Sequence, residues 1–315
     1  MMGTRIAGKS PRGRQERAER YRRLMVDSER SPSPSRVRCR QIADADLDPV
    51  AHLLERGFGA RRSLAFWRCA LASLKGRSTP ADMPRYGYLL ENDGVPVGVI
   101  LLIFSATPGG GALRANVSSW YVEPAFRSYA ALLVSQALKR RDVTYTNISP
   151  AHHTWPILEA QGYQRFSNGV FVAVPALHRG RHGRVLSADT VPDAPFESFE
   201  RELLVDHGEY GCISFWCATA DRAHPFVFRP RLVNGVIPCA QLIYCREVAD
   251  VVTFAGAIAR RLARRGLSFA IIDANGPIAG LTGRYFADRM PKYFRGPMRP
   301  RLGDLAYTEA ALFGV

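Results

Sequence analysis

A pair of histidines and one glutamate are the side chains best suited to proton transfer. His152 and His153 are adjacent and follow Pro150, and an imidazole titrates close to neutral pH. Glu123 precedes Pro124 at the end of an apolar run, and its carboxylate is a second candidate base. A solvated histidine pair and a surface carboxylate are the plainer alternatives. The sequence has no Ser-His-Asp spacing, metal-binding quartet or GxxxxGK loop, so hydrolase and nucleotide-hydrolysing chemistry have no support.

The junction after residue 122 could bind an anion. Residues 116–122 have the pattern of a strand, and Pro124 can begin the helix whose apolar residues recur up to Arg141. A chain that enters a helix presents unpaired N–H groups and the positive end of the helix dipole. Together these bind a pyrophosphate without a side-chain cation.

Residues 121–133 resemble the signature of the GNAT superfamily of N-acyltransferases, in which a strand leads through V-x-P-x-x-R-x-x-G-x-G into an amphipathic helix. Asn147 and the pair Gly162-Tyr163 match the family's later Asn and its closing G-F. The resemblance covers about residues 37–174, and it implies acyl-CoA, most simply acetyl-CoA, as co-substrate and no metal. The cofactor contacts that it implies come from Tyr121, Val122, Arg127, Ser128, Tyr129, Ala130, Ala131, Leu132 and Asn147.

Three positions depart from the family pattern. Ala130 replaces the first glycine and Leu132 stands where Gly or Ala is usual, so the phosphate cradle is more crowded. Leu158 occupies the usual place of a tyrosine acid. The resemblance puts Glu123 beside the thioester and His152 where the acceptor meets it, so these two are the predicted catalytic residues. Further candidates for the acid are Tyr163, His153 and Tyr129.

The elements around these residues predict an α/β (α+β) fold with a GNAT-like, mixed, mostly antiparallel sheet flanked by helices. Asn92-Asp93-Gly94 predicts a hairpin between strands at 86–91 and 95–105. A pair of strands is expected within residues 163–174. The predicted order for residues 36–175 is β-α-α-β-β-β-α-β-α-β.

The second half of the chain partly repeats this order without the motif. We expect a linker at residues 176–195 and a second, degenerate GNAT-like domain at 196–315, which includes a helix at 248–265. The fold is then a tandem, with an unrelated α/β cap as the alternative. A length of 315 residues agrees with two domains.

The amino-acid composition restricts the cellular compartment that we expect for the protein. The formal net charge is +15, and about half of the excess lies in residues 1–38. Residues 1–35 read as a disordered basic tail. The six cysteines form no CxxC pair, which favours buried thiols in a reducing cytoplasm. No run approaches the roughly 20 apolar residues that cross a bilayer, and no secretory signal is recognisable.

The sequence predicts a cytoplasmic enzyme that transfers an acyl group from acyl-CoA to a small-molecule or peptide amine. It does not predict an oligomeric state. A non-catalytic GNAT-like binding protein is one alternative. The other is an aminoacyl-tRNA-dependent transferase, because nucleic acid could contact clustered cations. Those cations, which a solvated helix face would also explain, are Arg260, Arg261, Arg264 and Arg265.

Overall fold

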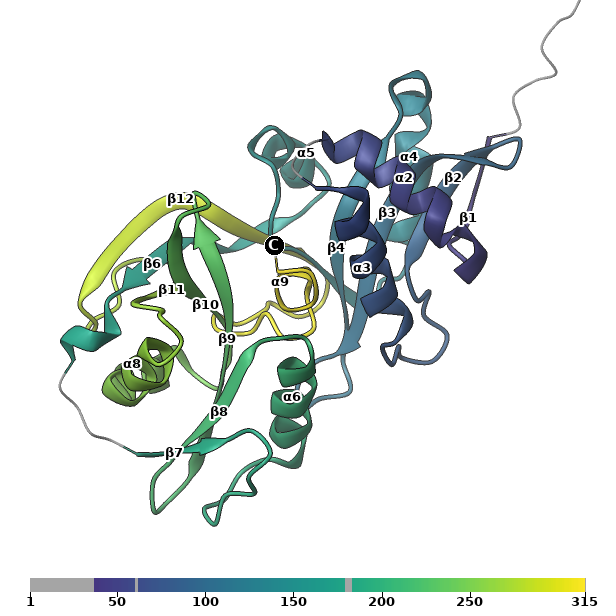
Figure 1. Cartoon of the computed structure of the whole chain (residues 1–315). Helices are drawn as coiled ribbons and strands as arrows, with labels where there is room; N and C mark the ends of the chain where they lie inside the picture. Colours follow the sequence, from purple (N-terminus) through teal and green to yellow (C-terminus); the bar gives the residue numbers. More distant parts are fainter. Residues whose placement is uncertain (1–36, 60–61, 179–182, 315) are drawn as a thin grey trace, which may run out of the picture.

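The computed structural model describes residues 37–59, 62–178 and 183–314, so the predicted tail at 1–35 lies outside them. Its strands form one continuous, mostly antiparallel sheet, which confirms the predicted fold class (Figure 1). The first half contains β1 (Val37–Gln41), α2 (Leu47–Phe58), α3 (Leu64–Lys75), β2 (Gly87–Asn92), β3 (Val95–Ala106), β4 (Leu113–Val122), η3 (Pro124–Tyr129), α4 (Ala130–Ala137), β5 (Val143–Asn147), η4 (His152–Thr154), α5 (Trp155–Ala160) and β6 (Gln164–Ala173).

The second half contains a similar succession of strands and helices. Its elements are β7 (Arg184–Ser187), α6 (Ser198–Glu209), β8 (Ile213–Ala218), β9 (Ala223–Val233), β10 (Ile237–Cys245), α7 (Val248–Thr253), α8 (Ala255–Ala263), β11 (Phe269–Ala274), β12 (Gly283–Arg295) and α9 (Glu309–Leu312). Among the described residues, no helix is both long and apolar enough to span a membrane.

The strand order is symmetric about the middle of the sheet. It runs β1-β2-β3-β4-β5-β12-β6-β11-β10-β9-β8-β7, so each half contributes five successive strands on one side of a central pair. That pair is exchanged: β12 lies beside β5, and β6 lies beside β11. The final strand of each half therefore completes the sheet of the other half.

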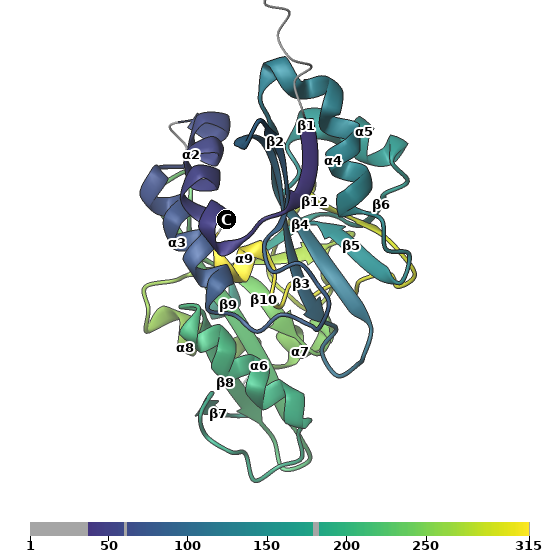
Figure 2. The ribbon, with the colours of Figure 1, turned by 90° about the vertical axis from the view of Figure 1, so that its right-hand side faces the viewer.

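Local sequence explains the elements that build the first half. The β2–β3 turn has positive φ at both Asp93 and Gly94, as a two-residue hairpin turn requires. Ser63 caps α3 by accepting a hydrogen bond from the backbone N–H of Phe66. Helices α2 and α3 pack on one face of the sheet, while α4 and α5 cover the other (Figure 2).

Several local expectations were wrong. The pair of strands expected at 163–174 is the single strand β6, because both edges of that segment pair with β11 and β12. The expected linker contains β7, which pairs with β8. The helix expected at 248–265 is divided into α7 and α8 at Phe254, whose buried ring anchors the break. No sequence pattern predicted β12.

Candidate active site

A gap opens between the parallel strands β4 and β5. The two strands pair only from Leu113 to Asn116, opposite Val143 to Thr146. Beyond that point, none of the described residues pairs with 117–122 of β4 on the side facing β5. The free backbone groups of this edge can hydrogen-bond to an extended ligand, as another strand would.

A bulge in β4 accompanies the gap. Ser118 pairs with Leu101 and Tyr121 pairs with Val99, so two residues of β4, Ser119 and Trp120, lie opposite Ile100. Ser119 has a φ of +46°, which is uncommon for a residue with a side chain. A bulge bends its strand, and this one lies just beyond the last pair that β4 makes with β5.

The gap has an apolar face and a polar face. On the side of α4 and α5, the partly buried rings of Trp120, Phe126 and Trp155 pack against the core. The opposite side holds hydroxyl and carboxylate groups. A ligand with an apolar arm and a polar reacting end therefore fits the chemistry of the gap.

Glu309 supplies the carboxylate, and the sequence reasoning missed it. The hydroxyl of Ser118 on β4 donates to its Oε2, and the hydroxyl of Ser149, which follows β5, donates to Oε1 at 2.5 Å. Burial raises the pKa of Glu309, whereas the two serine hydrogen bonds lower it by less. One carboxylate thus bridges the two diverging strands.

Asn116 fixes the place of Glu309 at the point where the strands separate. Its Nδ2 donates to the carbonyl oxygen of Thr146 on β5 at 3.3 Å, and its Oδ1 accepts from the backbone N–H of Glu309 at 2.7 Å. Asn116 is nearly fully buried. No sequence signal linked Asn116 to Glu309, because 193 residues separate them.

The segment that carries Glu309 is held by both halves of the chain. Arg114 of β4 forms an ion pair with Asp304 at 3.0 Å and donates to the carbonyl oxygen of Ala306 at 2.6 Å. From the second half, Arg229 donates to the carbonyl oxygen of Ala311 at 3.0 Å. In Figure 1 this C-terminal segment lies between β4 and β10.

The second half has an equivalent gap that is already filled. Strands β10 and β11 pair only from Cys239 to Gln241, and β10 has an extra residue at Ile243. Residues 303–305 then run along the free edge of β10. The N–H of Cys245 donates to the carbonyl oxygen of Gly303 at 2.9 Å, and the N–H of Leu305 donates to that of Ile243 at 2.7 Å. Residues 303–305 therefore fill the gap beside β10.

The predicted cofactor residues lie along β4, η3, α4 and β5. Val122 is buried at the end of the strand, Tyr121 packs towards α2, and Asn147 lies in β5 opposite Tyr293. The first turn after the strand is a 3-10 helix, in which the N–H of Phe126 already bonds to Glu123. The cradle is therefore tighter than an open loop. Exposed at its surface are Arg127, Ser128, Tyr129, Ala131 and Leu132, with Ala130 half-buried.

The two predicted catalytic residues lie on different elements and are engaged elsewhere. Glu123 forms an ion pair with Arg56 of α2 at 2.8 Å. His152 is exposed on η4, with its ring centroid 4.4 Å from that of Trp155. No hydrogen bond or ion pair joins Glu123 to His152 within the described part of the chain.

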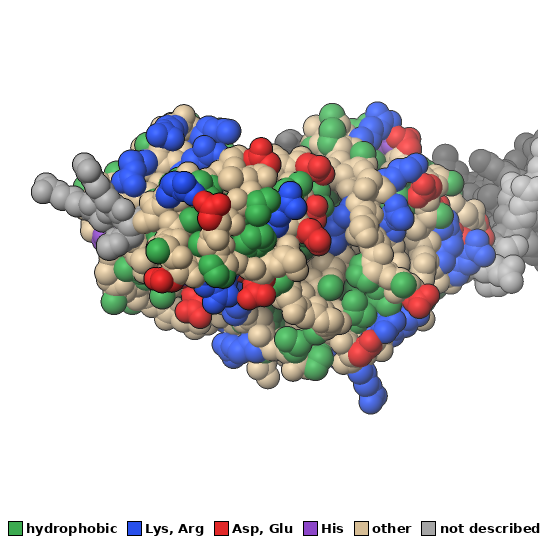
Figure 3. All heavy atoms as spheres, turned by 90° about the horizontal axis from the view of Figure 1, so that it is seen from below, with side chains coloured by type: hydrophobic (Ala, Val, Ile, Leu, Met, Phe, Trp, Pro, Cys, Tyr) green, Lys and Arg blue, Asp and Glu red, His purple; other side chains and the backbone are tan. Residues whose placement is uncertain are grey.

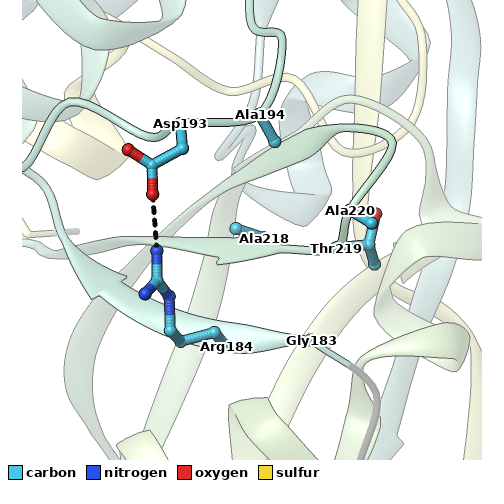
Figure 4. A pocket seen from close by; sticks show the side chains of 7 residues that line it. All are labelled: Gly183, Arg184, Asp193, Ala194, Ala218, Thr219 and Ala220. Carbon is cyan, nitrogen blue, oxygen red and sulfur yellow. Dashed lines mark hydrogen bonds and ion pairs between the residues drawn. The ribbon is translucent and has the colours of Figure 1, made fainter.

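Two cavities lie outside the gap. One of about 560 Å³ lies beside β7, where Arg184 pairs with Asp193 at 3.2 Å above Ala218 (Figure 4). The other, of about 390 Å³, is lined by Arg295 and Arg299 near the end of β12. Neither includes a residue of the open gap.

Four arginines lie in the last turn of α8 and directly after it. Arg261 packs its guanidinium 5.9 Å from the ring of Phe215, whereas Arg260, Arg264 and Arg265 are exposed. On the face seen in Figure 3, basic side chains gather at one end and elsewhere alternate with acidic and apolar ones. Within the described residues, this face therefore has no unbroken basic track of the kind that nucleic-acid phosphates contact.

The mixed sheet with its gap between β4 and β5 defines the fold that is compared here with known proteins. No protein-family model matches the sequence, and no curated protein sequence matches it. A candidate acetyltransferase from Pyrococcus horikoshii is 11% identical, with a TM-score of 0.53 over 86% of this chain and 93% of that one.

Two further structures give the same result. A GCN5-related N-acetyltransferase from Anabaena variabilis is 14% identical, with a TM-score of 0.52 over 82% of this chain and 72% of that one. A candidate N-acyltransferase from Enterococcus faecalis is 10% identical, with a TM-score of 0.52 over 85% and 73%. The chain therefore has the fold of the GCN5-related N-acetyltransferases, as the sequence resemblance predicted.

Proposed function

We propose that this protein transfers an acyl group, most simply acetyl, from acyl-CoA to an amine. The observation that carries the proposal is the gap between β4 and β5, which opens beyond Asn116 and leaves the edge of β4 unpaired. The pantetheine arm of acyl-CoA lies along this edge, and its thioester reaches the polar side of the gap. The fold shared with N-acetyltransferases supports the same chemistry.

The residues that follow the gap hold the rest of the cofactor. Val122 supplies backbone hydrogen bonds, and Tyr121 and Asn147 flank the arm on either strand. The pyrophosphate lies over the start of α4, near Ala130 and Arg127, where the dipole of the helix and one exposed guanidinium favour an anion. Around it lie Ser128, Tyr129, Ala131 and Leu132.

The chain is a tandem of two GNAT-like halves, 36–175 and 196–315, with exchanged final strands. The symmetric strand order supports this division, as do the bulges at equivalent places in β4 and β10. The second half shapes the acceptor cleft and binds no CoA of its own. A reducing cytoplasm suits the six free thiols.

Isothermal titration with CoA and acetyl-CoA tests the proposal. We expect the full chain to bind both, and Ala130→Glu to weaken binding at least tenfold because it places a negative charge against the pyrophosphate. The matched control is Ser135→Glu, on the exposed surface of the same helix. It should change the affinity less than threefold. Absence of heat with both ligands at millimolar concentration contradicts the proposal.

The buried Leu158 favours a second candidate, a non-catalytic binding protein, because the usual place of the acid holds a side chain that cannot donate a proton. A panel of amines incubated with acetyl-CoA separates the two functions. Release of CoA thiol with any amine supports the enzyme. CoA binding without transfer to any amine supports the binding protein.

A further inference from the structure

Glu309 lies on the opposite side of the sheet from the helix that would hold the cofactor phosphates. Its neighbours Leu312 and Phe313 pack with α2 and α3, whereas α4 covers the other face (Figure 2). The carboxylate lies in the gap that connects the two faces, between Ser118 and Ser149. A thioester that enters from the α4 face therefore meets Glu309 on its far side.

The carboxylate is buried but lies close to the surface. Glu309 is 4% exposed, whereas Ser149, whose hydroxyl it accepts, is exposed to solvent. An acceptor that takes the place of the Ser149 hydroxyl would hydrogen-bond to Oε1 of this carboxylate. Ser118 and Asn116 would keep Glu309 in place meanwhile.

The charge around Glu309 allows it to accept a proton. Among the described residues, Arg62 is the charged side chain near enough to affect its pKa, and no second carboxylate competes. Burial has the largest effect on Glu309 and raises its pKa, which favours uptake of a proton. Glu123, in contrast, is held by Arg56 at 2.8 Å.

We infer that Glu309 is the catalytic base, and that the acceptor is a primary amine that enters from the α2 and α3 face. This inference rests on the proposed acyl transfer. The amine nitrogen attacks the thioester carbonyl, the C–N bond forms and the C–S bond breaks. Glu309 first takes one proton from the ammonium form of the bound amine and later releases it to solvent, and the neutral nitrogen loses a second proton as the C–N bond forms. The CoA thiolate leaves with the electron pair and is then protonated by that proton through water.

The test is steady-state transfer from acetyl-CoA to primary amines such as amino acids, diamines and short peptides, followed through the CoA thiol. Glu309→Gln keeps one oxygen to accept from one serine hydroxyl and presents an NH2 group to the other, whose oxygen can accept, so the fold should be retained. We expect kcat to fall about 100-fold or more at pH 7, the usual size of general-base catalysis. The Kd for CoA should change less than threefold.

The pH profile separates a base from a structural carboxylate. Without the base only the neutral amine reacts, so the rate of the Glu309→Gln enzyme should rise tenfold per pH unit up to the pKa of the amine. Glu202→Gln, which removes an exposed carboxylate from α6, should match the parent. Glu309→Asp gives a second variant in case the amide disturbs folding. Its rate should lie between the rates of the parent and of Glu309→Gln.

Each result decides between the hypotheses. Full activity of Glu309→Gln with CoA binding intact overturns this inference and leaves the proposed function standing. A greater loss of kcat in Glu123→Gln than in Glu309→Gln overturns the inference in the same way. If the parent chain binds no CoA, the proposed function fails and the inference fails with it.

Discussion

The carboxylate of Glu309 and the hydroxyl of Ser149 lie 2.5 Å apart, although 160 residues separate them in the chain. Ser149 belongs to the half that carries the cofactor motif, and Glu309 belongs to the C-terminal segment. The contact brings the end of the chain to the point where β4 and β5 separate. A site that looks complete within residues 36–175 in sequence is thus completed by residues 303–313.

The first prediction concerns Ser149→Ala. The Ser149 hydrogen bond lowers the pKa of Glu309, so its removal should raise that pKa further. If Glu309 must be ionised to act, the acidic limb of kcat/KM against pH should move to higher pH. Ser135→Ala is the control, because its hydroxyl bonds only within α4, to Leu132. An unmoved limb in Ser149→Ala contradicts the assignment.

The second prediction concerns stoichiometry. Residues 303–305 occupy the gap beside Ile243 and Cys245, so only the gap beside β4 remains for a cofactor. Calorimetric titration should give one CoA per chain. Two equivalent sites would show that residues 303–305 leave β10 when ligand is present.

The third prediction is a loss of stability in acid. Burial lowers the pKa of His207 to about 4 from 6.5, and its Nε2 accepts from the backbone N–H of Tyr307 at 3.0 Å. The unfolded chain binds the proton first, so stability should fall as the pH drops from 6.5 towards 4, by on the order of 3 kcal/mol. In urea unfolding, the free energy of unfolding of His207→Gln should depend less on pH across this range. An equal slope in both proteins would exclude His207 as the cause.

The fourth prediction concerns the ion pair between Lys292 and Asp273, which lies inside the central sheet. Their atoms Nζ and Oδ1 are 2.6 Å apart, and the two residues are 0% and 4% exposed. Lys292→Met leaves a buried carboxylate without its partner and should cost about 3–5 kcal/mol in urea unfolding. The double variant with Asp273→Leu should recover most of this loss, since both charges are then gone. No recovery would mean that packing, and not charge, is responsible.

The fifth prediction compares two glycines with positive φ. A Cβ on Gly87 would lie 2.2 Å from the carbonyl oxygen of Ile100, whereas a Cβ on Gly94 meets nothing within 4 Å. Gly87→Ala should therefore cost about 3 kcal/mol or more, and Gly94→Ala only about 1 kcal/mol, from backbone strain. Equal losses in thermal unfolding would show that the backbone at Gly87 moves aside.

Local signals in the sequence were enough to predict much of the first half. The turn at Asn92-Asp93-Gly94 fixes the hairpin of β2 and β3, because its residues tolerate positive φ. The predicted order of elements has two helices before this hairpin, where α2 and α3 lie. Strand, Pro124 and helix follow one another as the resemblance required. These features depend on neighbours in the chain, so the sequence alone determines them.

The tertiary structure decided what depends on distant partners. Strand β12 contains Gly283, Asp288 and Pro291, has a mostly exposed first part and follows no clear alternation. It is a strand because β5 and β6 provide hydrogen-bonding edges on both sides. Glu309 gave no signal either, since a lone glutamate becomes a buried carboxylate only when Asn116, Ser118 and Ser149 are folded around it. Long-range pairing of this kind leaves no local pattern in the sequence.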